Sequence, residues 1–256
     1  MLGEELVELH EKPRLVPRFS ERYPGLTPDA GYSAARLLHD HRLKSGWRPV
    51  GRKIGFTNRT LWERYGVFEP MWGMVYDRTL IHARNDQARV ALEGLVQPRI
   101  EPEVCFKLKK APRTSAQDEI VSCIEWMAHS VEIVQCHHPE WKVTIADCTA
   151  DNGLHGRLIV GSPTPLTDPD KLPAVKARLF KSERLVDEGV GANVLGSPLL
   201  SLAFLIEVLK KQPEAPPLRP GEIVTTGVLT DAHPVAPGET WRTEVSGFPG
   251  LTLVFA

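Results

Sequence analysis

The stretch Pro98-Arg99-Ile100-Glu101-Pro102-Glu103-Val104-Cys105-Phe106 places two carboxylates two positions apart inside an apolar, β-prone run. Side chains alternate along a strand, so Glu101 and Glu103 would share one face of a sheet. A second run, Ser130-Val131-Glu132-Ile133-Val134, indicates another short strand carrying a third acid. The sequence therefore predicts that two strands carry three carboxylates among apolar neighbours.

Acids in such surroundings need a compensating interaction. A buried carboxylate is unfavourable unless it is paired, hydrogen-bonded or bound to a metal. Ligation by oxygen alone favours a hard ion such as Mg²⁺, Mn²⁺ or Ca²⁺. The alternative is a solvated strand edge, on which Glu101 and Glu103 simply face water. Spacing alone leaves both interpretations open.

Composition excludes some classes of function. The chain has 256 residues and a formal net charge of -1, and its basic clusters are too short for a nucleic-acid or anionic-membrane footprint. The start lacks a signal-peptide pattern, and no window has the length of a membrane span, so we expect a cytoplasmic protein. No linker separates independent domains, which favours one domain over residues 1–256.

The cysteines and histidines give weaker signals. The four cysteines form no C-x-x-C pattern and lie in apolar segments, as reduced core residues do. Cys136-His137-His138 is a poor zinc site, because three adjacent residues cannot readily face one ion. His129, His137 and His138 are expected to be surface or core histidines.

Periodicity outlines the remaining elements. Thr27 followed by Pro28 begins a helix that ends near Gly46, and a second helical pattern runs from Asp118 to His129. Closely spaced Gly and Pro in the second half favour short strands of a sandwich, roll or barrel. One helix, from Leu199 to Lys211, interrupts them.

Six blocks resemble, in order, those of the 2-keto-4-pentenoate hydratases, the hydratase and 4-oxalocrotonate decarboxylase branch of the fumarylacetoacetate hydrolase superfamily. The similarity runs from about residue 32 to the C-terminus. The blocks are Gly51-Arg52-Lys53-Ile54-Gly55-Phe56-Thr57, Pro98-Arg99-Ile100-Glu101-Pro102-Glu103, Val131-Glu132-Ile133-Val134, Asp151-Asn152-Gly153, Val194-Leu195-Gly196-Ser197-Pro198-Leu199 and Gly221-Glu222-Ile223-Val224-Thr225-Thr226-Gly227.

This resemblance implies an α+β fold, a β-rich roll of the fumarylacetoacetate hydrolase type with an N-terminal helical region. Residues of about 1–70 would form that largely helical region, and about 71–256 the β-rich metal-binding catalytic core. It also implies one Mg²⁺ or Mn²⁺ per subunit, held by Glu101, Glu103 and Glu132. The expected partners are a small 2-oxo acid or dienoate and further copies of the chain in a homo-oligomer.

Two residues are candidates for catalysis by the same resemblance. Lys53 would hold the substrate carboxylate or enolate, whereas without the matching block an exposed strand lysine would be the simpler interpretation. Asp77 follows the apolar pair Val75-Tyr76 and would transfer a proton or hold Lys53 in place.

Six further residues are candidates for contact with substrate. Gly73 and Gly227 would let backbone approach the ligand closely. Thr226 would bond substrate or play a structural role, and Asn152 would orient a loop near the metal. Leu154 and His155 stand where many relatives have small residues, so we expect them to govern which 2-oxo acid is accepted, unless they point to solvent.

The preferred function is therefore a metal-dependent hydratase, a hydro-lyase that converts a 2-hydroxy-2,4-dienoate of the 2-hydroxypenta-2,4-dienoate type to a 4-hydroxy-2-oxo acid in aromatic-compound catabolism. The alternatives are a 4-oxalocrotonate decarboxylase, acting on 2-oxo-3-hexenedioate, and an acylpyruvate-type hydrolase that cleaves a carbon-carbon bond. A basic group at the distal end of the pocket, Arg78 or Arg157, would favour the decarboxylase. A non-catalytic homologue that binds a 2-oxo acid or a partner enzyme fits least, because all three acids and the lysine are present.

Overall fold

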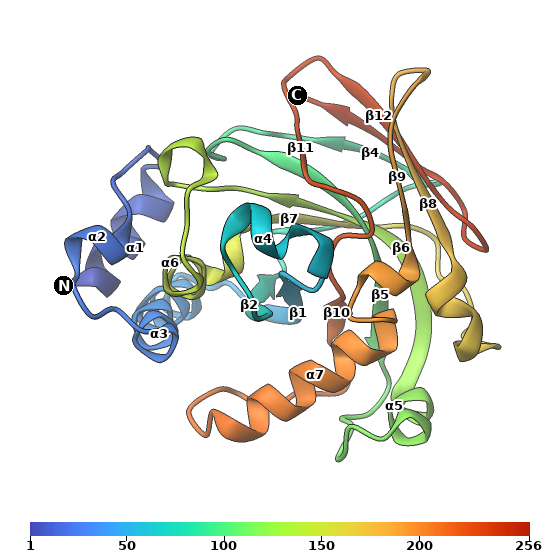
Figure 1. Ribbon diagram of the computed structural model, residues 1–256, viewed down its shortest axis with the longest axis horizontal. Helices are drawn as coiled ribbons and strands as arrows, with labels where there is room; N and C mark the ends of the chain where they lie inside the picture. The colour runs from blue at the N-terminus through green and yellow to red at the C-terminus, as the bar shows by residue number, and fades with distance from the viewer.

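The computed structural model describes all residues, 1–256, as two curled sheets with helices gathered mainly on one side (Figure 1). The larger sheet has eight strands in the order β2-β1-β10-β5-β6-β7-β3, and β11 pairs with β5. Its strands are β1 (Pro49–Gly55), β2 (Met71–Tyr76), β3 (Leu80–His82), β5 (Arg99–Leu108), β6 (Ile124–Val134), β7 (His155–Val160), β10 (Ile223–Thr225) and β11 (His233–Pro234).

The smaller sheet has five strands in the order β4-β13-β12-β8-β9, and it packs against the larger one. The interface is apolar because alternate residues of both sheets face it, as when Ile100 and Val131 meet Trp241 and Leu253. Its strands are β4 (Gln87–Val90), β8 (Lys176–Lys181), β9 (Arg184–Val190), β12 (Thr240–Val245) and β13 (Leu251–Phe255).

Helices pack against one face and one end of the larger sheet. Helix α7 (Pro198–Lys211) packs Leu202 and Leu205 against the face that carries Val104 and Phe106. The N-terminal helices, drawn in blue in Figure 1, lie with α6 at one end of that sheet. They are α1 (Leu2–Glu11), α2 (Phe19–Arg22), α3 (Pro28–Lys44) and α6 (Ile145–Ala150). None of the helices combines the length and apolar character needed to cross a membrane.

These features confirm the predicted α+β class and the N-terminal helices. The predicted cap of α3 is present, since the Thr27 hydroxyl accepts from the Ala30 amide at 3.2 Å. All four cysteines are buried and free, as expected. The division near residue 70 stays a prediction, and β1 from the N-terminal part is an inner strand of the larger sheet.

The predicted helix over 118–129 is wrong in its second half. Helix α5 spans only Gln117–Cys123, and β6 begins at Ile124. Ile124, Trp126 and Met127 all pair with β5. A short apolar run suits either a helix or a strand, so the long-range pairing with β5 decides the outcome here.

Strand register brings the three acids together. Glu101 of β5 lies opposite Glu132 of β6, and Glu103 lies opposite Ser130. On the other side of β5, β10 pairs with β1, which places Lys53 beside Thr225. Alternation then puts the lysine and the three acids on one face of the larger sheet.

Candidate metal and substrate site

Three carboxylates form the centre of the candidate site. One oxygen from each of Glu101, Glu103 and Glu132 lies within 4.8 Å of the others. Glu103 and Glu132 are 0% exposed, and Glu101 is half-buried. The structure therefore brings together the three acids predicted as metal ligands, and it does not expose Glu101 and Glu103 together on a solvated edge.

In Glu103 and Glu132, one carboxylate oxygen has a hydrogen-bond partner and the other oxygen has none. Glu103 Oε2 accepts from the Gly227 amide at 2.8 Å and from the Thr225 hydroxyl. Glu132 Oε1 contacts His155 Nδ1 at 2.8 Å. Glu103 Oε1 and Glu132 Oε2 are buried and have no hydrogen-bond partner, and only the Lys53 ammonium lies near Glu132 Oε2, at 3.3 Å. Such atoms are costly unless another group satisfies them, so they are available as ligand atoms.

The electrostatics favour a bound cation. Burial raises the pKa of Glu101 to about 7 and the pKa of Glu103 well above its ordinary value, and the neighbouring acids add to both shifts. Lys53 is the one ammonium beside them, so a divalent cation would balance the remaining negative charge. The oxygen-only donor set suits Mg²⁺ or Mn²⁺, and the residues present fit such an ion.

Lys53 lies inside this cluster and not on the surface. Its side chain is 2% exposed, and its Nζ is 3.3 Å from Glu132 Oε2. Burial by itself would lower the pKa of Lys53, but the charges of Glu132, Glu101 and Glu103 together raise it. The ammonium therefore stays protonated at neutral pH.

His155 contacts a predicted metal ligand and is absent from the cavity walls. Its Nδ1 contacts Glu132, and its Nε2 lies 2.9 Å from the Thr79 hydroxyl. Burial lowers the pKa of His155, although the Glu132 contact acts in the opposite direction. A neutral imidazole in this position donates from Nδ1 and orients the carboxylate of Glu132.

A cavity of about 50 Å³ lies against the Lys53 and Glu101 side chains. Leu154 and Met71 line it, and the predicted role of Leu154 in substrate choice stays a prediction. This volume is small beside the roughly 300–1,000 Å³ of typical ligand pockets. The other lining residues are mainly apolar: Gly55, Phe56, Asn58, Leu61, Tyr65, Val134, Trp141, Val228 and Ala232.

Asn152, Gly73 and Thr226 make structural contacts. The Asn152 side chain bonds both the amide and the carbonyl of Met74, at 2.9 and 3.0 Å, on the free edge of β2. A Cβ on Gly73 would lie 2.2 Å from the Asn152 carbonyl, so glycine permits this close approach. The Thr226 hydroxyl donates to the Val104 carbonyl at 2.8 Å. Their predicted contact with substrate stays a prediction.

Asp77 is not brought into the cluster. Its carboxylate bonds the backbone and guanidinium of Arg48 at 3.0 Å, and these bonds lower the pKa of Asp77. Lys53 is held by Glu132 instead. Arg78 bonds the Ser45 carbonyl and Arg157 bonds backbone carbonyls, so neither lines the cavity as a distal basic group.

A second buried cluster escaped the sequence analysis. His10 Nε2 and His137 Nδ1 contact the two oxygens of Asp151 at 2.8 and 2.7 Å, although His10 is 141 residues away. Arg42 lies 3.1 Å from His10 Nδ1. Because a guanidinium only donates, it places the His10 proton on Nε2, which then donates to Asp151. This tautomer supports a hydrogen-bonded cluster and not a metal site.

The sequence offered little sign of Thr225 and the Gly227 amide as partners of Glu103, or of Thr79 as the partner of His155. A threonine at a strand end is common, and its partner is set by the pairing of β10 with β5. Gly227 carried one signal, since it closes the last matching block. Its φ of +104° suits glycine, and its amide reaches Glu103.

Comparisons with known proteins agree with this geometry. The 2-hydroxyhexa-2,4-dienoate hydratase of Comamonas testosteroni is 30% identical over 99% of this chain and 96% of its own length. The 4-oxalocrotonate decarboxylase of Pseudomonas putida G7, solved with magnesium and adipate, has a TM-score of 0.91 at 25% identity, covering 100% of this chain and 96% of that one. No family model matches the chain.

The fold is shared with more distant proteins. A putative fumarylacetoacetate hydrolase family protein from Yersinia pestis CO92 has a similar fold, with a TM-score of 0.60 at 13% identity, covering 81% of this chain and 94% of that one. By sequence, the chain belongs to the family of 2-keto-4-pentenoate hydratases and 4-oxalocrotonate decarboxylases. It is an enzyme of the lyase class.

Proposed function

We propose that this protein is a metal-dependent hydratase that adds water to a 2-hydroxy-2,4-dienoate and forms a 4-hydroxy-2-oxo acid in the breakdown of aromatic compounds. The observation that carries this proposal is the chemistry of the cavity beside Lys53 and Glu101. Away from these two residues its walls are apolar or aromatic except for Asn58, and they contain no second cationic side chain. Such a cavity suits a substrate with one carboxylate and a hydrocarbon tail.

The three acids are the proposed ligands of one Mg²⁺ or Mn²⁺. Glu103 and Glu132 each offer a buried oxygen without a hydrogen bond, and Glu101 adds a third carboxylate. When bound there, the cation would supply Lewis-acid chemistry, binding the 2-oxo acid and withdrawing electrons from its conjugated chain.

The residues around the acids have distinct proposed roles. The Lys53 ammonium holds the negative charge of the substrate carboxylate or enolate, because it is compact, buried and protonated. His155 and Thr225 fix the carboxylates that face it. Leu154 and Trp141 exclude bulk water from the hydrocarbon end. The dienoate gains a proton at C5 and loses its 2-hydroxyl proton to give the 2-oxo-3-enoate, and water then adds its oxygen at C4 and a proton at C3.

A decarboxylase of 2-oxo-3-hexenedioate is the second candidate, and Arg99 favours it. The Arg99 guanidinium lies behind two cavity-lining residues, since it donates to the Tyr65 hydroxyl at 2.9 Å and lies 4.4 Å from the Trp141 ring centroid. A movement of Tyr65 would expose this charge to the distal carboxylate of a dicarboxylic substrate. In the present arrangement Tyr65 and Trp141 cover it, so the hydratase remains the proposal.

Direct assay separates these reactions. The purified protein with Mg²⁺ or Mn²⁺ is mixed with 2-hydroxypenta-2,4-dienoate and, separately, with 2-oxo-3-hexenedioate and an acylpyruvate. Loss of dienoate absorbance without CO₂ identifies the hydratase. Release of CO₂ from the dicarboxylate identifies the decarboxylase, and cleavage of the acylpyruvate to pyruvate and an acid identifies a hydrolase. Either of the last two results, without dienoate hydration, would overturn the proposal.

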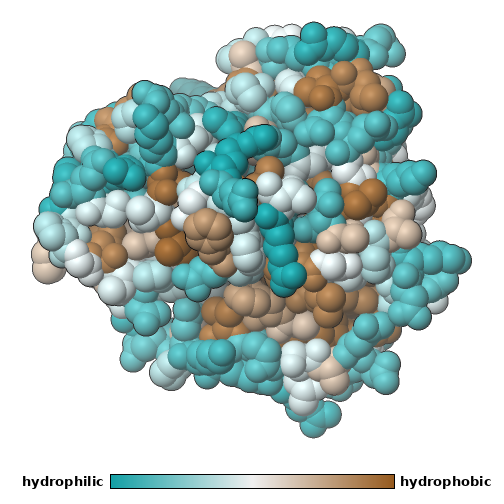
Figure 2. Space-filling model, viewed as in Figure 1, coloured by the Kyte–Doolittle hydropathy of each residue, from teal (hydrophilic) through white to brown (hydrophobic).

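We further propose that the protein works in the cytoplasm as a homo-oligomer. Several large apolar side chains are exposed. Figure 2 shows hydrophobic patches on the face of the molecule that is turned to the viewer, one of them over α7. Phe68 is 63% exposed and Leu200, on α7, is 49% exposed. Light scattering on the purified protein should give a multiple of the chain mass of 28.5 kDa, whereas a monomer would contradict this part of the proposal.

A further inference from the structure

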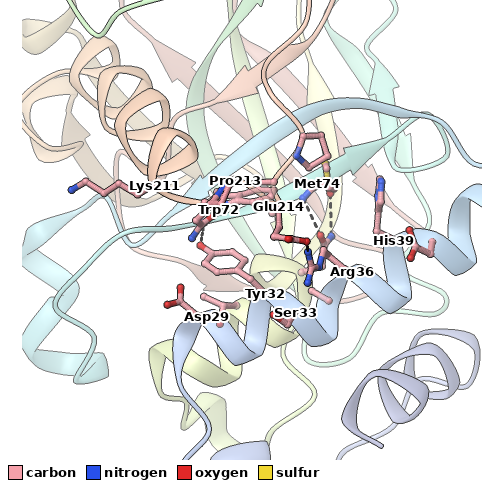
Figure 3. A pocket seen from close by; sticks show the side chains of 18 residues that line it. Asp29, Tyr32, Ser33, Arg36, His39, Trp72, Met74, Lys211, Pro213 and Glu214 are labelled. Carbon is pink, nitrogen blue, oxygen red and sulfur yellow. Dashed lines mark hydrogen bonds and ion pairs between the residues drawn. The ribbon is translucent and has the colours of Figure 1, made fainter.

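A larger cavity, of about 460 Å³, lies outside the catalytic cluster between α3, β2 and the loop that follows α7 (Figure 3). Helix α3 contributes Tyr32, Arg36 and His39 to one side of it. The loop contributes Pro213 and Glu214 to the other side. The proposed hydration uses none of these side chains.

One part of the lining of this cavity is apolar and aromatic. Tyr32 and Trp72 stack with ring centroids 5.2 Å apart and an angle of 19° between their planes. Their polar atoms are already bonded, because the Tyr32 hydroxyl accepts from the Trp72 amide at 3.0 Å and Trp72 Nε1 donates to Gln212 at 2.8 Å. Met74 and Ala35 extend the same lining. An aromatic ring gains edge or stacking contacts on such a surface.

Charges at the rim do not select an anion. Arg36 pairs with Glu214 between the two sides of the cavity, as Figure 3 shows. Lys211 is the other cation in the lining, and Asp29 and Asp40 oppose it. The lining therefore has no net positive charge, so a carboxylate or phosphate would lose more hydration than it would regain in attraction.

One short segment links this cavity to the catalytic cavity, because Asn152 lines the first and Leu154 lines the second. Gly73, Met74 and Asn152 line the larger cavity, and Asn152 is fixed to Met74 by two side-chain hydrogen bonds. The next residue, Gly153, lies so close to Lys53 that a Cβ there would be 3.0 Å from the Lys53 Cδ atom. A shift of this backbone at one cavity therefore changes the packing of the ammonium at the other.

We propose that the cavity between α3 and β2 is a second ligand site that takes a small neutral aromatic molecule, such as a phenol. The ring lies against Tyr32, Trp72 and Met74, and the occupied site acts on the catalytic cavity through Asn152 and Gly153. The proposal that a ligand binds here depends only on the cavity. The proposed effect on turnover also rests on the proposed hydratase function.

Binding is tested first, without turnover. Phenol is titrated into the metal-loaded protein by calorimetry, with benzoate and cyclohexanol as the charged and the non-aromatic comparison. We expect saturable phenol binding with Kd on the order of 0.1–1 mM, as suits a ligand of this size, and binding of the other two weaker by about fivefold or more. No saturable phenol binding, or tighter binding of benzoate, would overturn the proposal.

Matched variants locate the bound molecule. Ala35→Phe places bulk inside the cavity and should abolish phenol binding, whereas Leu43→Phe adds bulk on an exposed part of the same helix and should not. Circular dichroism confirms that both variants fold. Lys53→Met should bind phenol normally, and loss of binding in that variant would place the ligand in the catalytic cavity. A changed oligomer mass in Ala35→Phe would identify the cavity as a subunit interface and overturn the ligand site.

Coupling is measured as the ratio of kcat/KM with and without saturating phenol. This ratio should differ from one by about threefold or more in wild type and in Leu43→Phe, within the usual range for coupled sites. It should equal one in Ala35→Phe. If phenol binds but the ratio in wild type is unchanged, the coupling is overturned and the ligand site is not. If the enzyme binds phenol but is inactive, only the proposed function is overturned.

Discussion

At the scale of single residues, each acid of the centre has its own set of contacts. Glu103 is held by Thr225 and the Gly227 amide, and Glu132 is held by His155. The one buried ammonium beside them belongs to Lys53, which contacts Glu132. Substitutions at these positions should therefore distinguish three roles, which are holding the charge of the substrate, binding the metal and selecting the substrate.

For Lys53, we predict a role in turnover and not in folding. Lys53→Met should fold and bind metal but lose activity by about 100-fold or more, the usual loss when a preorganised charge is removed. Lys53→Arg should restore little, because a planar guanidinium does not replace a compact ammonium. Steady-state kinetics and a metal titration measure both effects. Near-normal turnover in Lys53→Met would rule out the role.

The neighbouring residues Leu154 and His155 should give different results, since Leu154 lines the cavity and His155 bonds Glu132. Leu154→Ser should shift relative kcat/KM between short and long dienoates by about tenfold, the size of one pocket contact. His155→Ala should instead weaken metal binding by about 10-fold or more, as loss of a residue that orients a ligand does. A His155→Ala enzyme with normal metal affinity and altered substrate preference would reverse this assignment.

At the scale of elements, the N-terminal helix α1 is tied to the segment that leads into the site. His10 on α1 bonds Asp151, the residue directly before the Asn152-Gly153-Leu154 turn. Leu6 and Leu9 of the same helix are fully buried and pack against Ala150. We therefore expect α1 to stabilise the Asn152-Gly153-Leu154 segment, which links the two cavities.

The burial of His10 predicts a pH dependence of stability. Burial lowers the pKa of His10 to about 4 from an ordinary value of 6.5. The unfolded chain then binds a proton between these values and the folded chain does not, so the free energy of unfolding should fall as pH drops from 6.5 toward 4, by about 3 kcal/mol if His10 acts alone. His10→Gln should show a shallower loss in urea unfolding at several pH values. Equal slopes for both proteins would contradict the assignment.

Elements whose signals are local were predicted correctly from the sequence. The prediction was wrong where pairing with a distant strand decides between helix and strand. The cap at Thr27 and the alternation of Glu101 and Glu103 follow from neighbouring residues, and both are observed. The strand over Ile124–His129 depends on pairing with β5, and its apolar pattern equally suited a helix. The contact of His10 with Asp151 joins residues that no spacing rule connects.

At the scale of the whole molecule, bound metal and folding are linked, because strands from distant parts of the chain supply the ligands. Metal that binds only the folded state adds about 2.7 kcal/mol to stability at 100 times its Kd. Removal of metal by a chelator should therefore lower the midpoint of thermal unfolding, and added Mg²⁺ or Mn²⁺ should restore it. Identical midpoints with and without metal would indicate that the acids are compensated in another way.

The most direct test of the central claim is a calorimetric titration of the metal-free protein with Mn²⁺, repeated on Glu103→Gln. Glu125→Gln, an exposed acid on the strand that carries Glu132, is the matched control. We predict one ion per chain for wild type and for Glu125→Gln, and no measurable binding or turnover for Glu103→Gln. Stoichiometric binding by Glu103→Gln at wild-type affinity would contradict a metal centre built from Glu101, Glu103 and Glu132.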